Sequence, residues 1–346
     1  MKILTIIGAR PQFIKSASIS EKINKQNNLS EITVHTGQHF DYNMSNIFFN
    51  EMNLSKPNYN LGINKMNHGA MTSKMIQKLE PIIIDEDPSG VLVYGDTNST
   101  LAGSLTAAKL NKPIFHVEAG LRSYDRSMPE EINRIITDHL SSILFCPTEN
   151  AKNNLIKEGI NENVIVSGDV MYDSFLKYSK QLKDNHDENK ISSNYILATI
   201  HRQENTDDKD RLISIFYNLD RINNESKIIM PIHPRTMEKI HKYGIKTNIE
   251  ILQPVGYLRM LSLLNNSDVV ITDSGGLQKE AYFAQKKCIT IRDQTEWTEL
   301  IDSKVNILSE PGSLHEKYNE IKNKKFNFLN YLFGKGKASE CIVNSI

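Results

Sequence analysis

The chain has 346 residues, enough for two domains, and carries 41 basic and 41 acidic side chains. Apolar residues make up 39% and charged residues 24%, the balance of an ordinary globular protein. A net charge of zero argues against a nucleic-acid partner or an acidic membrane surface. An anionic substrate would therefore need local cationic groups.

The three cysteines, Cys146, Cys288 and Cys341, are far apart and lack the spacing of a metal site or a disulfide framework. We expect reduced structural thiols, as in the cytoplasm. The apolar run before Gly8 is too short for a signal peptide, and no run approaches the roughly 20 residues of a membrane span. The sequence predicts a cytoplasmic protein without a membrane partner.

Short apolar runs alternate with helical patterns in the first half of the chain. The predicted strands are KILTIIG, EITVHTG, VLVYGD, PIFHVEAG, LFCPT and VIVSGD. Their apolar residues are consecutive, which is typical of strands in a parallel sheet covered by helices on both faces. STLAGSLTAAKL and SMPEEINRIITDHL are predicted helices, the second with Pro129 near its first position.

A second series begins near Tyr195 and contains YILATIHR, KIIMPIHP, IEILQPV, DVVITDSGG and KCITIRD. The polar stretch KQLKDNHDENKISSN between the two series is typical of a linker. We therefore predict an α/β fold with two Rossmann-like doubly wound domains. The predicted parts are an N-terminal domain at 1–172, a linker at 173–194, a C-terminal domain at 195–325 and a tail at 326–346.

Polar residues follow the predicted strands with unusual frequency. Ligands of doubly wound folds bind outside the carboxyl ends of the strands. The residues found there are Arg10, His35, Gln38, His39, Asp96, Glu118, His201, His233, Asp273, Ser274 and Arg292. A purely structural protein needs few of these side chains, so their concentration predicts an enzyme.

The segment DSGGLQKEA has the features of a phosphate cradle. Ser274 offers a hydroxyl, and Gly275 and Gly276 let backbone amides at a helix N-terminus approach an anion. Glu280 lies one helical turn further on the same face, where a carboxylate can bind ribose hydroxyls. An ordinary N-cap followed by an exposed helical glutamate explains the same residues.

Basic side chains surround the first predicted turn, GARPQFIK. Arg10 is a candidate for binding a pyrophosphate, and Lys15 has a weaker claim. A surface ion pair is the alternative for Arg10. His201 and Arg202 follow a strand, which favours a functional role. No pair of histidines has metal-ligand spacing where ligands would converge, so we expect no metal.

Carboxylates are concentrated in the first domain, at Asp96, Glu118, Glu130 and Glu131. Such groups act as acid and base where their surroundings separate their pKa values. Glu118 lies in an apolar segment, so we expect it to be partly buried, with Arg122 as a candidate partner. Asp96 is alternatively a helix cap, and the two later glutamates alternatively complement a helix dipole.

Together these motifs resemble the non-hydrolysing UDP-N-acetylglucosamine 2-epimerase family. The resemblance runs from GARPQFIK through TGQHFD, VYGDTNSTLAG, HVEAGLRS, MPEEINR, SGDVMYD, HRQEN, PIHPR and TDSGGLQKEA to IRDQTEW. It implies a glycosyltransferase-B-type fold with two Rossmann-like domains around a cleft, and usually a homodimer. It also implies that the last helix, at GSLHEKYNEIKNKKF or beyond, crosses back to the first domain.

The resemblance also assigns roles to residues. Those expected to bind UDP are Arg10, Lys15, Ser274, Gly275, Gly276, Glu280 and Arg292. Those expected to be catalytic are Asp96, Glu118, Glu130 and His201, with Glu131 as the alternative to Glu130. Those expected to contact or support the substrate are Gln38, His39, Glu131, Arg202 and His233.

The implied reaction inverts C2 of a UDP-linked 2-acetamido sugar, for surface polysaccharide biosynthesis. The C2 proton is only weakly acidic, but expulsion of UDP from C1 acidifies it and gives a 2-acetamidoglycal. Re-addition of UDP with protonation of the other face inverts C2. No cofactor is required, and the glycines of a nicotinamide site are absent. A hydrolysing 2-epimerase, a glycosyltransferase of the same fold and an inactive binding module are the alternatives.

Two departures from the family pattern concern the sugar. Gln12 stands where many UDP-N-acetylglucosamine enzymes have Glu, and Trp297-Thr298-Glu299 stands where they have Arg-Pro-Glu. Both resemble the subgroup acting on UDP-2,3-diacetamido-2,3-dideoxyglucuronate, and neutral Gln12 would not repel a substrate carboxylate. Loss of the arginine points the opposite way, so the sequence leaves the sugar open. Ala70 and Met71 occupy the segment where allosterically activated members carry Gln, which predicts weak or absent activation.

Overall fold

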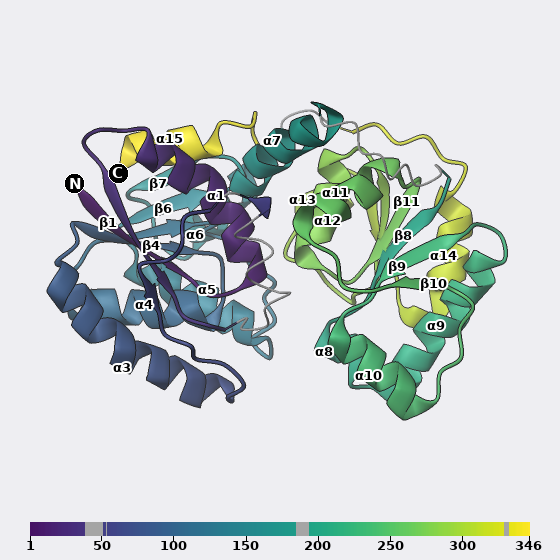
Figure 1. Ribbon diagram of the computed structural model, residues 1–346. Coiled ribbons are helices and arrows are strands. Elements are labelled where there is room, and N and C mark those ends of the chain that lie inside the picture. Colours follow the sequence, from purple (N-terminus) through teal and green to yellow (C-terminus); the bar gives the residue numbers. More distant parts are fainter. Residues whose placement is uncertain (39–50, 53, 185–193, 329–331) are drawn as a thin grey trace. The chain divides into compact units, whose positions relative to one another are not determined.

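The structure, a computed structural model, describes residues 1–38, 51–52, 54–184, 194–328 and 332–346. The chain divides into two compact units, each built around its own parallel sheet (Figure 1). Unit 1 comprises Met1–Leu176 and Tyr331–Ile346, and unit 2 comprises Lys177–Asn330. No helix in the described part of the chain is both long and apolar enough to cross a membrane.

Unit 1 contains a seven-stranded sheet in the order β3-β2-β1-β4-β5-β6-β7, with every pair parallel. The strands are β1 (Lys2–Ile7), β2 (Ser30–His35), β3 (Tyr59–Asn60), β4 (Gly90–Tyr94), β5 (Ile114–Val117), β6 (Ile143–Cys146) and β7 (Val164–Val166). The central strands are buried along their whole length, as their consecutive apolar residues predict. The sequence did not predict β3, because two partly exposed residues carry no apolar pattern.

The helices of unit 1 are α1 (Arg10–Asn24), α3 (His68–Glu86), α4 (Asn98–Lys109), α5 (Pro129–Leu140), α6 (Glu149–Lys157), the first part of α7 (Val170–Asp184) and α15 (Ala338–Ser345). Helices α3, α4 and α5 cover one face of the sheet, and α1 and α15 lie on the other (Figure 1). Leu79 and Met75 of α3 pack with Leu4 and Val93 of the strands in a continuous apolar core.

Helix α7 corrects the predicted linker. The helix covers 170–184, so the first part of the predicted linker at 173–194 is helical, and residues 185–193 lie outside the described part. Its polar residues alternate with buried Phe175 and Tyr178, which is the pattern of an amphipathic helix. Composition alone did not distinguish this surface helix from a linker.

The C-terminal segment returns to unit 1 as α15, which packs against α1 (Figure 1). The helix at the segment GSLHEKYNEI, α14 (Leu314–Ile321), belongs to unit 2, so only the chain beyond it crosses back. Asp173 of α7 anchors the return, since its buried carboxylate accepts hydrogen bonds from the Ala338 and Ser339 amides and from the Ser339 hydroxyl.

Unit 2 contains a six-stranded parallel sheet in the order β10-β9-β8-β11-β12-β13. Its strands are β8 (Ile196–Thr199), β9 (Ile228–Pro231), β10 (Glu250–Leu252), β11 (Val269–Thr272), β12 (Lys287–Thr290) and β13 (Asn306–Leu308). Its other helices are α8 (Gln203–Thr206), α9 (Lys209–Asn223), α10 (Pro234–Tyr243), α11 (Tyr257–Asn266), α12 (Gly275–Phe283), α13 (Thr298–Asp302) and a short 3-10 turn at Pro311–Ser313.

Both sheets reverse their strand order at one point, between β1 and β4 in unit 1 and between β8 and β11 in unit 2. This is the topology of doubly wound folds, and it confirms the predicted fold class of two Rossmann-like units. Loops leaving adjacent strands at such a point diverge, which leaves a crevice where ligands bind. The residues after β1, β4, β8 and β11 are therefore the first to consider as a site.

The anchoring of α15 by Asp173 leads to a stability prediction. Asp173→Asn places an amide NH2 group toward at least one of three donors, so we expect the free energy of unfolding to fall by about 1–3 kcal/mol. Amide hydrogen exchange of α15 should accelerate, because its N-terminus loses its acceptor. Unchanged exchange in α15 would show that apolar packing on α1 alone holds this helix.

Candidate functional site

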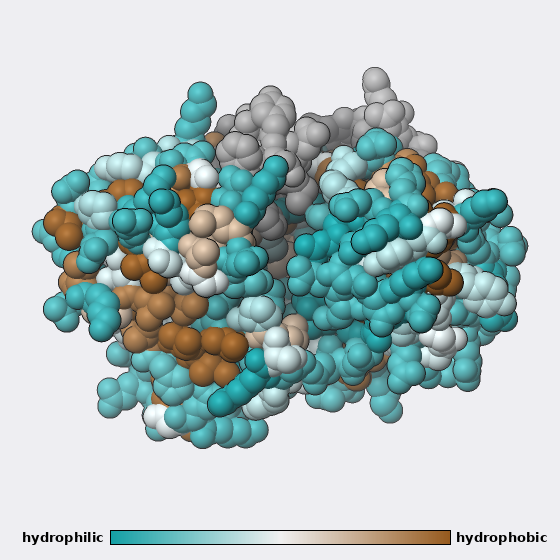
Figure 2. All heavy atoms as spheres, turned by 90° about the horizontal axis from the view of Figure 1, so that it is seen from below, coloured by the Kyte–Doolittle hydropathy of each residue, from teal (hydrophilic) through white to brown (hydrophobic). Residues whose placement is uncertain are grey.

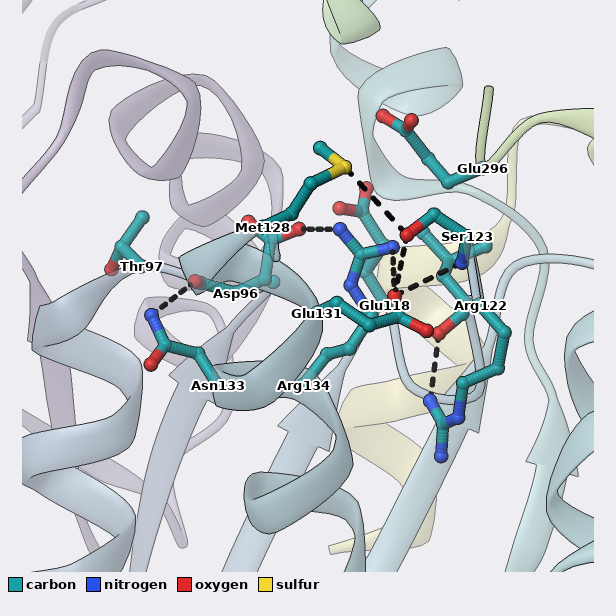
Figure 3. Close-up of polar contacts among 12 residues, drawn as sticks. Asp96, Thr97, Glu118, Arg122, Ser123, Met128, Glu131, Asn133, Arg134 and Glu296 are labelled. Atoms are coloured by element: carbon teal, nitrogen blue, oxygen red, sulfur yellow. Dashed lines mark hydrogen bonds and ion pairs between the residues drawn. The ribbon is translucent and has the colours of Figure 1, made fainter. Parts of the chain in front are cut away.

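Asp96 follows β4 at the switch point of unit 1 and is held by helix α5 (Figure 3). Its carboxylate lies 2.7 Å from Nη2 of Arg134, and its carbonyl accepts a hydrogen bond of 2.9 Å from Asn133. Thr97, not Asp96, caps α4, since the Thr97 hydroxyl accepts from the Thr100 amide. The interpretation of Asp96 as a mere helix cap is therefore wrong.

Glu118 follows β5 and has a backbone φ of +72°, a left-handed conformation that is rare for a residue with a side chain. Such strain concentrates at functional sites. Its buried carboxylate lies 2.5 Å from the ammonium of Lys15, which is also buried. The predicted partner was wrong, because Arg122 pairs with Asp138 and Glu158 instead.

Arg10 and Lys15 both belong to α1, whose first residue is Arg10. Arg10 is half-buried at the carboxyl end of β1, beside the switch point. Lys15 points its charge at Glu118, which means that one of the predicted UDP ligands neutralises a predicted catalytic carboxylate. Charge pairing of this kind is what makes burial of both groups affordable.

Glu130 and Glu131 occupy the first turn of α5 but have different surroundings. Glu131 is fully buried and accepts hydrogen bonds from the Ser123 amide and hydroxyl and from the Tyr124 amide, while Arg134 lies 3.2 Å away. These contacts hold the loop before α5 (Figure 3). Glu130 is partly exposed, so it has access to a ligand that Glu131 lacks.

Gln12 does not have the environment that its comparison with Glu assumed. It is buried, its oxygen accepts from the Gly8 and Ala9 amides, and its nitrogen donates to the Tyr94 carbonyl and to the Thr97 and Thr100 hydroxyls. Its amide thus joins β1, β4 and α4. The argument that Gln12 spares a substrate carboxylate is wrong, because the side chain is fully engaged within the protein.

Gln38 also binds the protein, since its oxygen accepts from the Ser99 amide at 3.3 Å and the Ser99 hydroxyl at 2.9 Å. It therefore supports the N-terminal turn of α4. His39 lies outside the described residues.

His201 follows β8 at the switch point of unit 2 and faces Asp273, which follows β11. Nδ1 of His201 lies 3.1 Å from Oδ1 of Asp273, and Asp273 also accepts from the amides of His201 and Arg202 and from Asn205. Burial alone would raise the pKa of Asp273, but the positive charge of His201 and these hydrogen bonds lower it to about 2. A carboxylate at Nδ1 fixes the orientation of the imidazole ring.

His233 lies next to His201, with ring centroids 5.8 Å apart. His233 caps α10, because its Nδ1 accepts from the Arg235 amide at 3.2 Å. Its remaining proton is therefore on Nε2, which makes that atom a donor. Arg202 lies between His201 and α8, so the predicted supporting pair gathers around the predicted catalytic histidine.

The N-terminus of α12 follows Asp273 directly. Ser274 caps the helix by accepting from the Leu277 amide, so the ordinary N-cap interpretation holds for its hydroxyl. The amides of Gly275 and Gly276 have no acceptor within the helix, and their partial positive charge favours an anion. A Cβ on Gly275 would lie 2.6 Å from Glu296 Oε1, so this position requires glycine.

Arg292 and Glu280 are both buried in unit 2. Arg292 lies 2.8 Å from Glu296 and 3.9 Å from Glu204, so its guanidinium already balances acidic groups. Glu280 is 5% exposed, which rules out the interpretation of a solvent-exposed helical glutamate. No three metal-ligating side chains converge among the residues that the structure describes.

Sequence reasoning overlooked the role of Asp273 and the whole pairing of His116 with Asp138. Asp273 was noticed only as a residue at a strand end, and a signal existed, because the strands β8 and β11 that carry His201 and Asp273 are neighbours in a doubly wound sheet. His116 lies inside an apolar run, where nothing marks it as paired.

The low pKa of Asp273 has a consequence for stability. Its pKa is lower in the folded than in the unfolded chain, so its carboxylate stabilises unit 2 above pH 4, by about 2 kcal/mol, and this contribution is lost as pH falls from about 4 through 2. Asp273→Asn should remove it. Urea unfolding followed by fluorescence of Trp297, the single tryptophan of the chain and a residue of unit 2, measures the difference.

We expect the stability difference between wild type and Asp273→Asn to shrink by about half between pH 7 and pH 3. A difference of the same size at both pH values would contradict a depressed pKa at Asp273.

Comparison with known proteins agrees with this geometry. The family model described as UDP-N-acetylglucosamine 2-epimerase matches residues 21–346. The UDP-2,3-diacetamido-2,3-dideoxy-D-glucuronate 2-epimerase of Pseudomonas aeruginosa is 49% identical, covering 99% of this chain and 98% of that one. The UDP-N-acetylglucosamine 2-epimerase of Methanocaldococcus jannaschii is 44% identical over the same shares.

The crystal structure of the Methanocaldococcus jannaschii enzyme in complex with UDP-GlcNAc and UDP superimposes with a TM-score of 0.94 at 43% identity, covering 99% of both chains. A family model that matches most of the chain and full-length relatives well above 30% identity establish a common family. The chain belongs to the UDP-N-acetylglucosamine 2-epimerase family and is an epimerase.

Proposed function

We propose that this epimerase inverts C2 of a UDP-linked 2-acetamido sugar without hydrolysing it, through elimination of UDP to a 2-acetamidoglycal and re-addition. The observation that supports this most directly is the set of carboxylates at Asp96, Glu118 and Glu130, each with a different environment. Proton transfer at carbon needs an acid and a base whose pKa values differ. The product would supply surface polysaccharide biosynthesis.

Unit 2 supplies the groups proposed to bind UDP. The N-terminus of α12 offers amides to a phosphate, and Glu280 is proposed to hold the ribose. His201, oriented by Asp273, would donate a hydrogen bond to the departing diphosphate as the bond between C1 and its oxygen breaks and the electron pair goes to UDP. Arg10 and Arg292 are proposed to add positive charge to the same group.

Unit 1 supplies the groups proposed to move the C2 proton. One carboxylate takes the proton as UDP leaves, and an acid on the other face of the glycal returns a proton as UDP re-adds. Glu118 is paired with Lys15, Asp96 is paired with Arg134, and Glu130 has neither partner, so Glu130 is the member of this set best suited to carry a proton. Electrons and atoms balance, since UDP both leaves and returns.

Two sugars fit this proposal, UDP-N-acetylglucosamine and UDP-2,3-diacetamido-2,3-dideoxyglucuronate. Relatives named for each are 44% and 49% identical to this chain, so identity does not choose between them. Both have the 2-acetamido group and the UDP leaving group that the mechanism needs. The same assay run on each sugar identifies the substrate.

The mechanism predicts uptake of solvent deuterium. Incubated in deuterated water, the enzyme should convert either or both sugars to a mixture of C2 epimers that carries deuterium at C2 and still carries UDP. Proton NMR follows both changes. Epimers without deuterium would exclude proton exchange at C2, and accumulation of free sugar with UDP would show a hydrolysing enzyme.

Glu130 and Glu149 make a matched pair, since each lies in the first turn of a helix, α5 and α6. Glu130→Gln should lower kcat at least about 100-fold, because an amide cannot exchange the proton. Glu149→Gln removes the same charge from a helix N-terminus and should leave kcat unchanged. Equal kcat values in the two variants would remove Glu130 from the mechanism.

We also propose a homodimer formed through the outer face of α3, α4 and α5. Apolar side chains gather over this layer, which faces the viewer in Figure 2. Leu101, Leu105, Ile135 and Ile136 are only partly buried there, and Ile132 is 44% exposed. A contiguous apolar face of this kind is typical of a subunit interface.

Substitution of Ile132 tests the dimer. Ile132→Glu places a charge in the proposed interface and should shift the mass measured by light scattering from dimer to monomer. Ile213→Glu is the control, since Ile213 is a similarly exposed isoleucine in unit 2. A monomeric wild type, or dissociation by both variants alike, would contradict an interface on this face.

A further inference from the structure

A chain of buried polar contacts in unit 1 ends on the backbone beside Asp96, and the proposed mechanism uses none of its members. It begins at His116 on β5, which is completely buried. Nε2 of His116 lies 2.8 Å from the Gly95 carbonyl, and Nδ1 lies 2.7 Å from Oδ1 of Asp138. A buried histidine with an acceptor at each nitrogen is fixed in both position and orientation.

Asp138 of α5 joins His116 to the loop after β5. Its second oxygen accepts from the Gly120 amide at 3.1 Å and from Nη1 of Arg122 at 2.7 Å. Arg122 in turn binds Glu158 through Nε and Nη2. Burial by itself raises the pKa of Asp138, but the charges of His116 and Arg122 lower it below its usual range, so the carboxylate stays charged.

The Gly95 carbonyl is a sensitive point for this network to hold. Gly95 has a φ of +61°, and a Cβ there would lie 3.1 Å from Lys15 Nζ and 3.4 Å from Glu118 Oε1. The Gly95 backbone therefore lies directly against the buried ion pair, and Asp96 is the next residue. Rotation of this peptide would shift the Asp96 carboxylate and open space beside Glu118.

Helix α5 holds the same short segment at three places. Asn133 donates to the Asp96 carbonyl, Arg134 pairs with the Asp96 carboxylate, and Asp138 acts through His116 on the Gly95 carbonyl. Two of these contacts are direct and one passes through the imidazole. A rigid helix with several contacts of this kind places a functional loop more precisely than the loop places itself.

We propose that His116 and Asp138 are positioning residues of the epimerase reaction, which hold the Gly95 carbonyl and thereby set the carboxylates of Asp96 and Glu118. This inference rests on the proposed function of those two carboxylates. Displacement of a catalytic group by about 1 Å costs about 100-fold in rate, so loss of the Gly95 contact should appear in kcat. UDP affinity should not change, because the proposed UDP groups of α12 belong to unit 2.

Two substitutions of His116 separate this role from a general contribution to stability. In His116→Asn the amide nitrogen reaches about as far as Nδ1, so the contact with Asp138 survives and the contact with Gly95 is lost. In His116→Gln the nitrogen reaches about as far as Nε2, so the contact with Gly95 survives and that with Asp138 is lost. Each variant removes one of two buried hydrogen bonds.

We expect His116→Asn to lower kcat by about 10- to 100-fold, with UDP affinity by calorimetry unchanged and KM nearly so. His116→Gln should retain most of the wild-type kcat. Asp173→Asn is the control, because this other buried carboxylate of unit 1 binds α15 and should change stability without changing kcat. Asn133→Ala, which removes a second hold on Asp96, should lower kcat as His116→Asn does, and it provides the test if a His116 variant does not fold.

Equal kcat values in the two His116 variants, or wild-type kcat in Asn133→Ala, would overturn the positioning role. A wild-type enzyme that exchanges no C2 proton would instead refute the proposed function itself, so the two failures are distinguishable.

Discussion

Buried charge is the constraint on which the rest of this structure depends. Parallel sheets bury the ends of their strands, so a carboxylate placed there must be matched by cations or amide donors. Glu118 is matched by Lys15, Asp96 by Arg134, and Asp273 by His201 with two backbone amides. In each unit these pairs gather at the switch point of the sheet, where the loops diverge.

The two units use that constraint for different purposes. Unit 1 gathers carboxylates whose partners differ, which suits the transfer of a proton to and from carbon. Unit 2 gathers a histidine, an arginine and the N-terminus of α12, which suits the binding and release of a diphosphate. The chemistry of UDP elimination requires both sets, and each is built within its own sheet.

Acidic residues that look equivalent in the sequence have different roles in the structure. Glu130 and Glu131 are neighbours, yet one is partly exposed and the other is consumed by the loop before α5. Asp138 and Glu158 hold Arg122 rather than a ligand. Burial and hydrogen-bond donors, which depend on the packing of α5 against two loops, decide which carboxylate remains available for chemistry.

The sequence by itself determined the two doubly wound units and most of their strands, because consecutive apolar residues identify strands buried on both faces. It also determined which polar residues follow those strands, since that depends only on order along the chain. Partners were decided by the tertiary structure alone. Lys15 is 103 positions from Glu118, and His201 is 72 from Asp273, so only the pairing of strands brings them together. Gln12, read from the sequence as facing the substrate, is buried for the same reason, because β1, β4 and α4 meet around it.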